Sequence, residues 1–141
     1  MTEKLTIADY PLAETRSADM RGQRGKSLDD ITLDAVLSGE VTMEDLRITP
    51  SALAGQAEIS RSAKRPTLAL NFERAAELVD IPQDFIMSSY ELLRPGRAKS
   101  KQVLLEMANT FRQIHKAERM AKFVEEAADV YERRGLFIRR F

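Results

Sequence analysis

Hydrophobic residues recur at helical spacing between Asn71 and Pro95, and the polar residues between them predict two short amphipathic helices. The stripe of the first helix is Phe72, Ala75, Ala76 and Val79, and that of the second is Phe85 or Ile86, Ser89 or Tyr90, and Leu93. Pro82 suits the first turn of the second helix, and Pro95-Gly96 ends it. The pattern predicts a helical hairpin over residues 67–94, with Phe72 and Leu93 in its core.

Threonines at capping positions predict three more helices upstream. Thr32, Thr42 and Thr49 each precede an apolar-periodic segment and offer an oxygen to its free N–H groups. The expected features are a helix through Leu37 closed by Gly39, the first-turn acids Glu44 and Asp45, and a helix from Pro50 to about Ala63. Pro66 then restarts the chain.

A long helical tract follows the capping residue Ser100. Its two apolar stripes are Val103, Met107, Phe111 and Ile114, then Ala121, Val124, Ala128 and Tyr131. Either one helix runs from Lys101 to Arg134 or two helices meet near Ala117, and the lack of proline and glycine favours continuity. Strict alternation is missing throughout, so the fold class predicted is all-α.

Both ends of the chain place large apolar residues outside the capped helices. Residues 1–26 are expected to form an extended arm, because Tyr10-Pro11-Leu12 resists helix formation, and Gly22 and Gly25 predict a mobile link. The apolar residues of the arm and of the C-terminal tail are Leu5, Ile7, Tyr10 and Leu12, and Leu136, Phe137, Ile138 and Phe141. We expect them to dock on another chain rather than on this domain, which is assigned residues 27–141.

Composition indicates an ordinary globular protein. Hydrophobic residues make up 43% and charged residues 31%, and Lys+Arg balances Asp+Glu at 22 each. The balance argues against nucleic acid and anionic membranes as partners. No apolar run suits a membrane span, the N-terminus lacks the apolar core of a signal peptide, and cysteine is absent. We expect a cytoplasmic protein.

The catalytic inventory is thin. His115 is the one histidine and is placed inside a helical tract, where a surface or half-buried role is typical. Asp29-Asp30 is assigned to a helix start and Glu125-Glu126 to a solvated face, because adjacent helical residues do not face each other.

Basic residues and glycines give no phosphate site either. The run Gly22 to Gly25 follows no strand and lacks the ending of a P-loop. The basic clusters, expected at helix ends, are Arg61, Lys64 and Arg65, and Arg94 with Arg97. One of the last two arginines could bind a partner's carboxylate. The sequence predicts no catalytic, cofactor-binding or metal-ligating residue in this chain.

Four segments in order resemble the small subunit of the adenosylcobalamin-dependent diol and glycerol dehydratases. They are GKSLDDITLDAVLSG (Gly25 to Gly39), EDLRIT (Glu44 to Thr49), NFERAAEL with IPQD and LRP (Asn71 to Pro95), and FVEEAADVY (Phe123 to Tyr131). The resemblance runs from about Tyr10 to Tyr131. It implies an all-α, non-catalytic subunit in a complex with a large TIM-barrel subunit and a medium subunit, two copies of each.

The family resemblance also implies the chemistry of the complex. Adenosylcobalamin lies between the large and medium subunits, and a monovalent cation lies in the large one. The reaction converts glycerol or propane-1,2-diol to an aldehyde and water by a radical route, and the substrate stays open. Two departures, Gly96 and the terminal GLFIRRF, concern local partner contacts. The short N-terminus favours free cytosol over a bacterial microcompartment. The alternative function is a free-standing helical adaptor that binds proteins.

Overall fold

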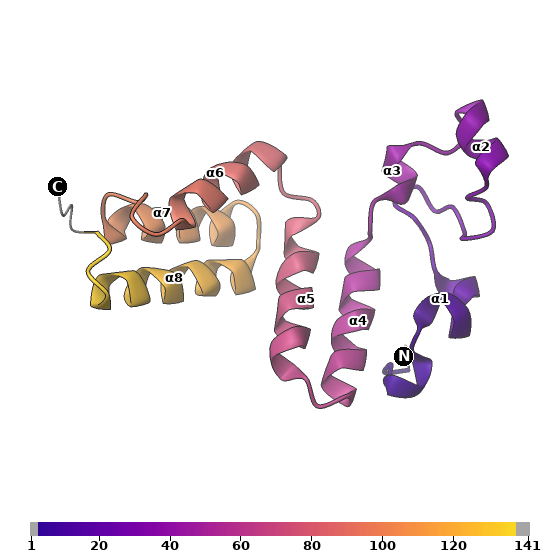
Figure 1. Ribbon diagram of the computed structural model, residues 1–141, viewed down its shortest axis with the longest axis horizontal. Helices are drawn as coiled ribbons and strands as arrows, with labels where there is room; N and C mark the ends of the chain where they lie inside the picture. The colour runs from indigo at the N-terminus through magenta and orange to yellow at the C-terminus, as the bar shows by residue number, and fades with distance from the viewer. Residues whose placement is uncertain (1–2, 138–141) are drawn as a thin grey trace. The chain divides into compact units, whose positions relative to one another are not determined.

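The protein is all-α in its computed structural model, which describes residues 3–137 (Figure 1). Within that range no strand forms, and a single isolated bridge joins Arg21 to Ser27. The elements are the short turns η1 (Ile7–Asp9) and η2 (Ser17–Asp19), and the helices α1 (Leu12–Thr15), α2 (Leu33–Ser38), α3 (Met43–Leu46), α4 (Pro50–Ser62), α5 (Pro66–Leu78), α6 (Gln83–Leu93), α7 (Lys101–Gln113) and α8 (Glu118–Arg133).

The predicted caps are confirmed. The hydroxyls of Thr32, Thr49 and Ser100 accept the amides that open α2, α4 and α7. Gly39 closes α2 with a φ of 82°, a left-handed conformation that costs glycine no steric strain. These signals are local, which is why the sequence alone was sufficient to find them.

The tract after Ser100 consists of two helices, so the continuous helix favoured by the sequence is wrong. α7 ends at Gln113 and α8 begins at Glu118. The chain reverses through Lys116, which adopts a φ of 55°, and the amide of Ala117 donates to the carbonyl of Phe111 at 2.9 Å. His115 therefore lies in this connection rather than inside a helix.

The chain packs as two compact units, one up to Val79 and one from Asp80. The predicted boundary between residues 26 and 27 falls inside the first unit. In that unit α4 and α5 lie side by side as a helical hairpin (Figure 1). Its core includes Leu53, Ala57 and Ala69, and Arg61 of α4 pairs with Glu73 of α5 across the two helices.

The N-terminal segment lies on this hairpin and is not a plain extended arm. Tyr10 and Pro11 are extended as predicted, but Leu12 begins α1 and is buried. The amide of Leu5 donates to Glu58 of α4 at 2.8 Å. Leu5 and Leu12 thus pack within their own unit, whereas Ile7 and Tyr10 stay exposed.

The second unit is built on the α7–α8 hairpin, with α6 against α7. Leu104, Phe111 and Val124 are its largest fully buried apolar side chains. The ring of Phe85 on α6 meets Phe111 edge-on at 4.8 Å between centroids, a favourable aromatic geometry. The hydroxyl of Tyr131 on α8 donates to the carbonyl of Leu93 and so ties the end of α6 to α8.

The hairpin predicted over residues 67–94 is therefore wrong in its pairing, although both helices exist. α5 packs with α4 and α6 packs with α7, and the two belong to different units. Phe72 and Leu93 are half-buried rather than core residues. A proline between two helices breaks the chain, but it does not decide which neighbour each helix joins.

The described part of the C-terminal tail also rests on its own unit. Leu136 and Phe137 are half-buried, and the Phe137 ring lies 6.3 Å from that of Tyr131. This differs from the docking on another chain favoured by the sequence. Ile138 and Phe141 lie outside the described residues.

Candidate functional site

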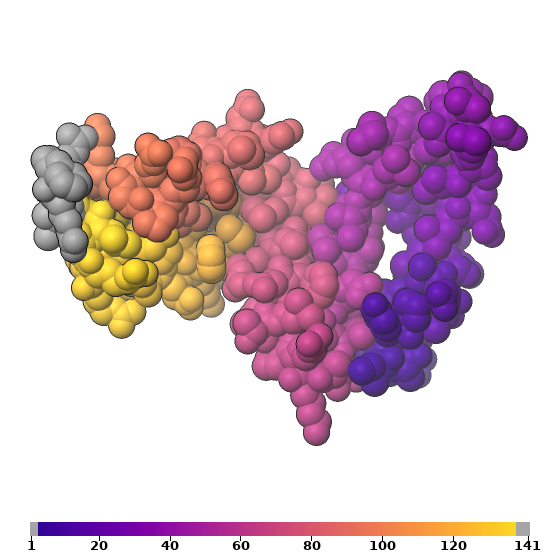
Figure 2. Space-filling view, in the orientation of Figure 1, coloured from indigo at the N-terminus to yellow at the C-terminus, as the bar shows by residue number. Residues whose placement is uncertain are grey.

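The region that carries the most exposed apolar surface is the α2–α3 segment, residues 28–48. It forms the purple surface at the upper right of Figure 2. α2 is capped at both ends by Thr32 and Gly39. α3 opens where the Asp45 carboxylate accepts the amide of Thr42 at 2.8 Å. Both helices are single turns or little more, so the segment depends on contacts beyond its own helices.

The buried residue of α3 is an acid. Asp45 is 2% exposed, and its carboxylate accepts hydrogen bonds from both Nε and Nη2 of Arg24, the first at 2.8 Å. These bonds to the Arg24 guanidinium, helped by the Thr42 amide, lower the pKa of Asp45 to about 2. Asp45 is therefore ionised at neutral pH and holds residues 21 positions apart together as a bidentate ion pair.

The turn around Arg24 fixes the rest of the segment through its backbone. Arg24 also donates to the carbonyl of Glu40 at 3.0 Å, and Gln23 donates to the carbonyl of Ile48 at 3.0 Å. Gly22 lies so close to α3 that a Cβ built on it would be 2.6 Å from the carbonyl oxygen of Asp45. The mobile link predicted at Gly22 and Gly25 is thus wrong, because this turn is clamped to α3.

The outward side of the same segment is apolar. Val41 is its one buried large apolar residue. Leu28 is 43% exposed, and six others are between 47% and 77% exposed: Leu33, Val36, Leu37, Met43, Leu46 and Ile48. α2 has no buried residue at all. The segment is therefore anchored to the chain by the buried Asp45 and Val41, and it leaves most of its large apolar side chains in solvent, unlike a helix packed on its own core.

The carboxylate pairs and the histidine are not brought together. Asp30 accepts the amide of Ser27 at 2.8 Å in a turn before α2, rather than at a helix start. Glu125 on α8 is bound by Arg112 at 2.7 Å, so it is not simply solvated. His115 is half-buried with its ring 4.8 Å from Phe85. These contacts are structural and assemble no acid–base pair.

The basic clusters are likewise engaged within the chain. Arg61 pairs with Glu73, and Arg94 and Arg97 both pair with Glu91, at 3.0 and 3.3 Å. Arg94 and Arg97, one of which was expected to bind a partner's carboxylate, thus both bind a carboxylate of their own chain. Each pair is exposed enough that it contributes at most about 1 kcal/mol to stability.

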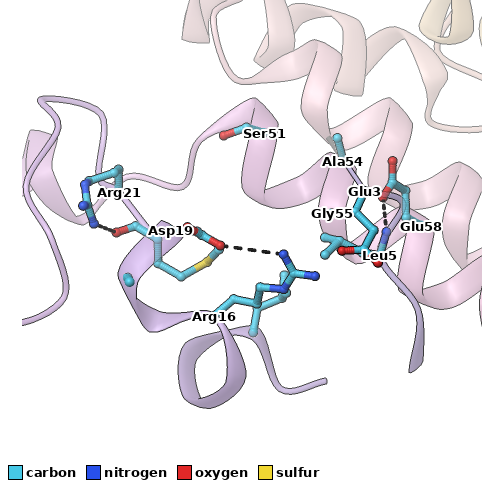
Figure 3. Close-up of a pocket in the computed structure, with 12 residues that line it drawn as sticks. Glu3, Leu5, Arg16, Asp19, Arg21, Ser51, Ala54, Gly55 and Glu58 are labelled. Carbon is cyan, nitrogen blue, oxygen red and sulfur yellow. Dashed lines mark hydrogen bonds and ion pairs between the residues drawn. The ribbon is translucent and has the colours of Figure 1, made fainter. Parts of the chain in front are cut away.

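A groove of about 660 Å³ separates the N-terminal segment from α4 (Figure 3). Leu12 and Gly55 line it together with Arg16 and Glu58. Glu58 accepts the Leu5 amide, and Arg16 pairs with acids of its own segment. Arg16 and Glu58 therefore both have partners within the chain.

Over the part of the chain that the structure describes, no three His, Cys, Asp or Glu residues come together. No buried polar side-chain atom there lacks a hydrogen-bond partner. Across residues 3–137, no helix is both long and apolar enough to cross a membrane.

Neither the exposure of the apolar side chains of the α2–α3 segment nor its Arg24–Asp45 ion pair was predicted from the sequence. The spacing of Leu33, Val36 and Leu37 was visible as a helical stripe, but a stripe does not say whether it is buried. Asp45 was recognised as a first-turn acid, yet its bond to Arg24 spans too many residues for any local pattern to reveal.

Comparison with known proteins identifies the family of this chain. The model of the family described as dehydratase small subunit matches residues 5–137. The chain is 45% identical over 128 residues to the propanediol dehydratase small subunit of Salmonella typhimurium strain LT2, a match that covers 91% of this chain and 73% of that protein. It is equally similar to the propanediol dehydratase small subunit of Citrobacter freundii, with 91% and 74% covered. The chain belongs to the dehydratase small subunit family.

Proposed function

We propose that this chain is the non-catalytic small subunit of an adenosylcobalamin-dependent dehydratase that acts on propane-1,2-diol or glycerol. The observation that carries the proposal is the α2–α3 segment, whose apolar side chains face away from the chain. Leaving a large apolar side chain in water forfeits about 1.5–3 kcal/mol. Six of them on one segment are typical of a subunit that completes its fold in an assembly.

The partners proposed are a large TIM-barrel subunit and a medium subunit, with two copies of each chain. Adenosylcobalamin and a monovalent cation belong to those partners. The donor chemistry of this chain supports that division, since it has no cysteine and its one histidine packs against Phe85. When bound in such a complex, adenosylcobalamin supplies the radical that removes hydrogen from the diol.

The residues of this chain have a structural role. The Arg24–Asp45 pair and the backbone bonds around it keep α2 and α3 in place. We place the complex in the cytoplasm, which cell fractionation with an antibody to this chain would test. A free-standing adaptor has less support, because the family is defined as a dehydratase subunit.

Co-expression tests the proposal. A tagged copy of this chain is produced with the large and medium subunits encoded beside it, and the purified complex is assayed with propane-1,2-diol and with glycerol. The expected result is co-purification of both larger subunits and activity that needs adenosylcobalamin. Calorimetry on the chain alone should show no cobalamin binding. Micromolar binding there, or purification without larger subunits, contradicts the proposal.

A further inference from the structure

We propose that the six most exposed apolar residues of the α2–α3 segment form the docking surface for a larger subunit of the dehydratase, an inference that rests on the proposed function. The partner surface expected is an apolar hollow edged by lysine and arginine.

The first argument is the amount of apolar side chain that the segment leaves exposed. A helix that packs on its own domain buries its apolar stripe, but α2 exposes Leu33, Val36 and Leu37 and buries nothing. α3 buries the carboxylate of Asp45 and exposes Met43. Leu46 and Ile48, the last two of the six residues, are exposed as well. These apolar side chains are therefore exposed in this chain, and a partner that covered them would remove them from water.

The second argument is charge, which separates a larger subunit from a second copy of this chain. Between residues 28 and 48 the one basic residue is Arg47, and it pairs with Glu44 at 3.1 Å. The acids of the same stretch include the exposed Asp29 and Asp34. A two-fold contact of this surface with itself would set these carboxylates against their own copies, which is destabilising. A different chain with lysine and arginine around its contact surface would form favourable charge pairs with the same acids.

A photo-crosslink identifies the occupant. Leu37 is replaced by p-benzoylphenylalanine in the tagged chain, the three subunits are co-expressed, and the purified complex is irradiated. Ile114 is the matched control, because it is equally large and exposed (71% against 75% for Leu37) but belongs to the other unit. A Leu37 adduct with a larger subunit, in clear excess over Ile114, is expected. An adduct with a second copy, no adduct, or equal adducts from both positions overturns the assignment.

Affinity gives the second measurement. Leu33→Gln/Leu37→Gln removes two exposed apolar side chains, and glutamine keeps the helix propensity of leucine. We expect the variant to bind the larger subunits at least tenfold more weakly than wild type, with an unchanged thermal melt, while Ile114→Gln binds normally. Asp34→Lys should slow association, because it reverses a rim charge. Equal binding by wild type and the double variant overturns the inference, whereas failure of wild type itself to co-purify overturns the proposed function instead.

Discussion

Gly22→Ala should damage the α2–α3 segment through one methyl group. The new Cβ would lie 2.6 Å from the carbonyl oxygen of Asp45, and ordinary contact begins near 3.4 Å, so the two backbones must separate by about 0.8 Å. The oxygen belongs to the main chain and cannot rotate away. Gly22 has no positive φ, so alanine adds no conformational strain of its own. The effect is purely steric.

The separation would pull α3 away from the turn that holds it. Overpacking of this kind costs about 1–3 kcal/mol. For a unit of this size each kcal/mol lowers the melting temperature by about 4–8 °C. Urea denaturation of the full chain measures the cost. Hydrogen exchange locates it, with faster exchange expected at the amides of residues 42–48 and little change in α7 and α8.

Gly55→Ala is the matched control, since it adds the same methyl in the same unit. Its Cβ would come 3.0 Å from Cδ1 of Leu5, the end of a side chain that can rotate. In the interior of α4, alanine also gains about 0.5–1 kcal/mol over glycine in helix propensity. We expect Gly55→Ala to be neutral or slightly stabilising. If Gly22→Ala leaves the urea midpoint and the exchange of residues 42–48 unchanged, the close approach does not hold the segment.

Three further outcomes follow from individual side chains. Phe111→Ala should lower the free energy of unfolding by about 3–5 kcal/mol because the ring is 1% exposed, while Phe123→Ala, 39% exposed, should cost far less in the same denaturation experiment. The folded pKa of Asp45 is depressed from 3.8 to about 2, so its stabilising contribution is full above about pH 4 and is lost as the pH falls through 2. Denaturation midpoints between pH 2 and 6 should show that loss in wild type and a flatter profile in Arg24→Gln; equal profiles would refute the role of the pair. Lys116→Gly should raise the melting temperature, because it relieves about 1–2 kcal/mol of strain at a φ of 55° and costs only about 0.5–1 kcal/mol in the greater conformational freedom of glycine; a lower value would contradict that.

The parts of the fold that the sequence predicted are those with a local cause. A threonine or serine cap acts on an amide three residues away, so Thr32, Thr49 and Ser100 could be read directly. The break between α7 and α8 had no such mark, because Lys116 occupies a left-handed position where glycine is the usual signal. The absence of proline and glycine was therefore a misleading guide to continuity.

Pairing between helices was harder to predict because it depends on distant residues. Phe72 and Leu93 were placed in one hairpin core, yet their helices belong to different units. The same difficulty hid the candidate site. Arg24 and Asp45 are ordinary surface residue types in the sequence, and only the folded turn brings them within 2.8 Å. Identity, by contrast, was accessible early, since family-specific segments are carried in the sequence itself.

An apolar stripe shows that one face of a helix is suited to burial, but not whether that face is buried within the same chain or against another chain. The stripes of α2 and α7 have the same period, yet α7 buries Leu104 and Phe111 whereas α2 exposes Leu33 and Leu37. What differs is how the α2–α3 segment is held. α3 is held by the Arg24–Asp45 ion pair, and the turn between α2 and α3 is held by the bond from Arg24 to the carbonyl of Glu40 and by the buried Val41. Such a segment is ordered before its partner arrives, so binding need not repay the entropy of folding it. A small subunit gains most from this arrangement, because every apolar residue left outside its own core is free to contribute to the interface.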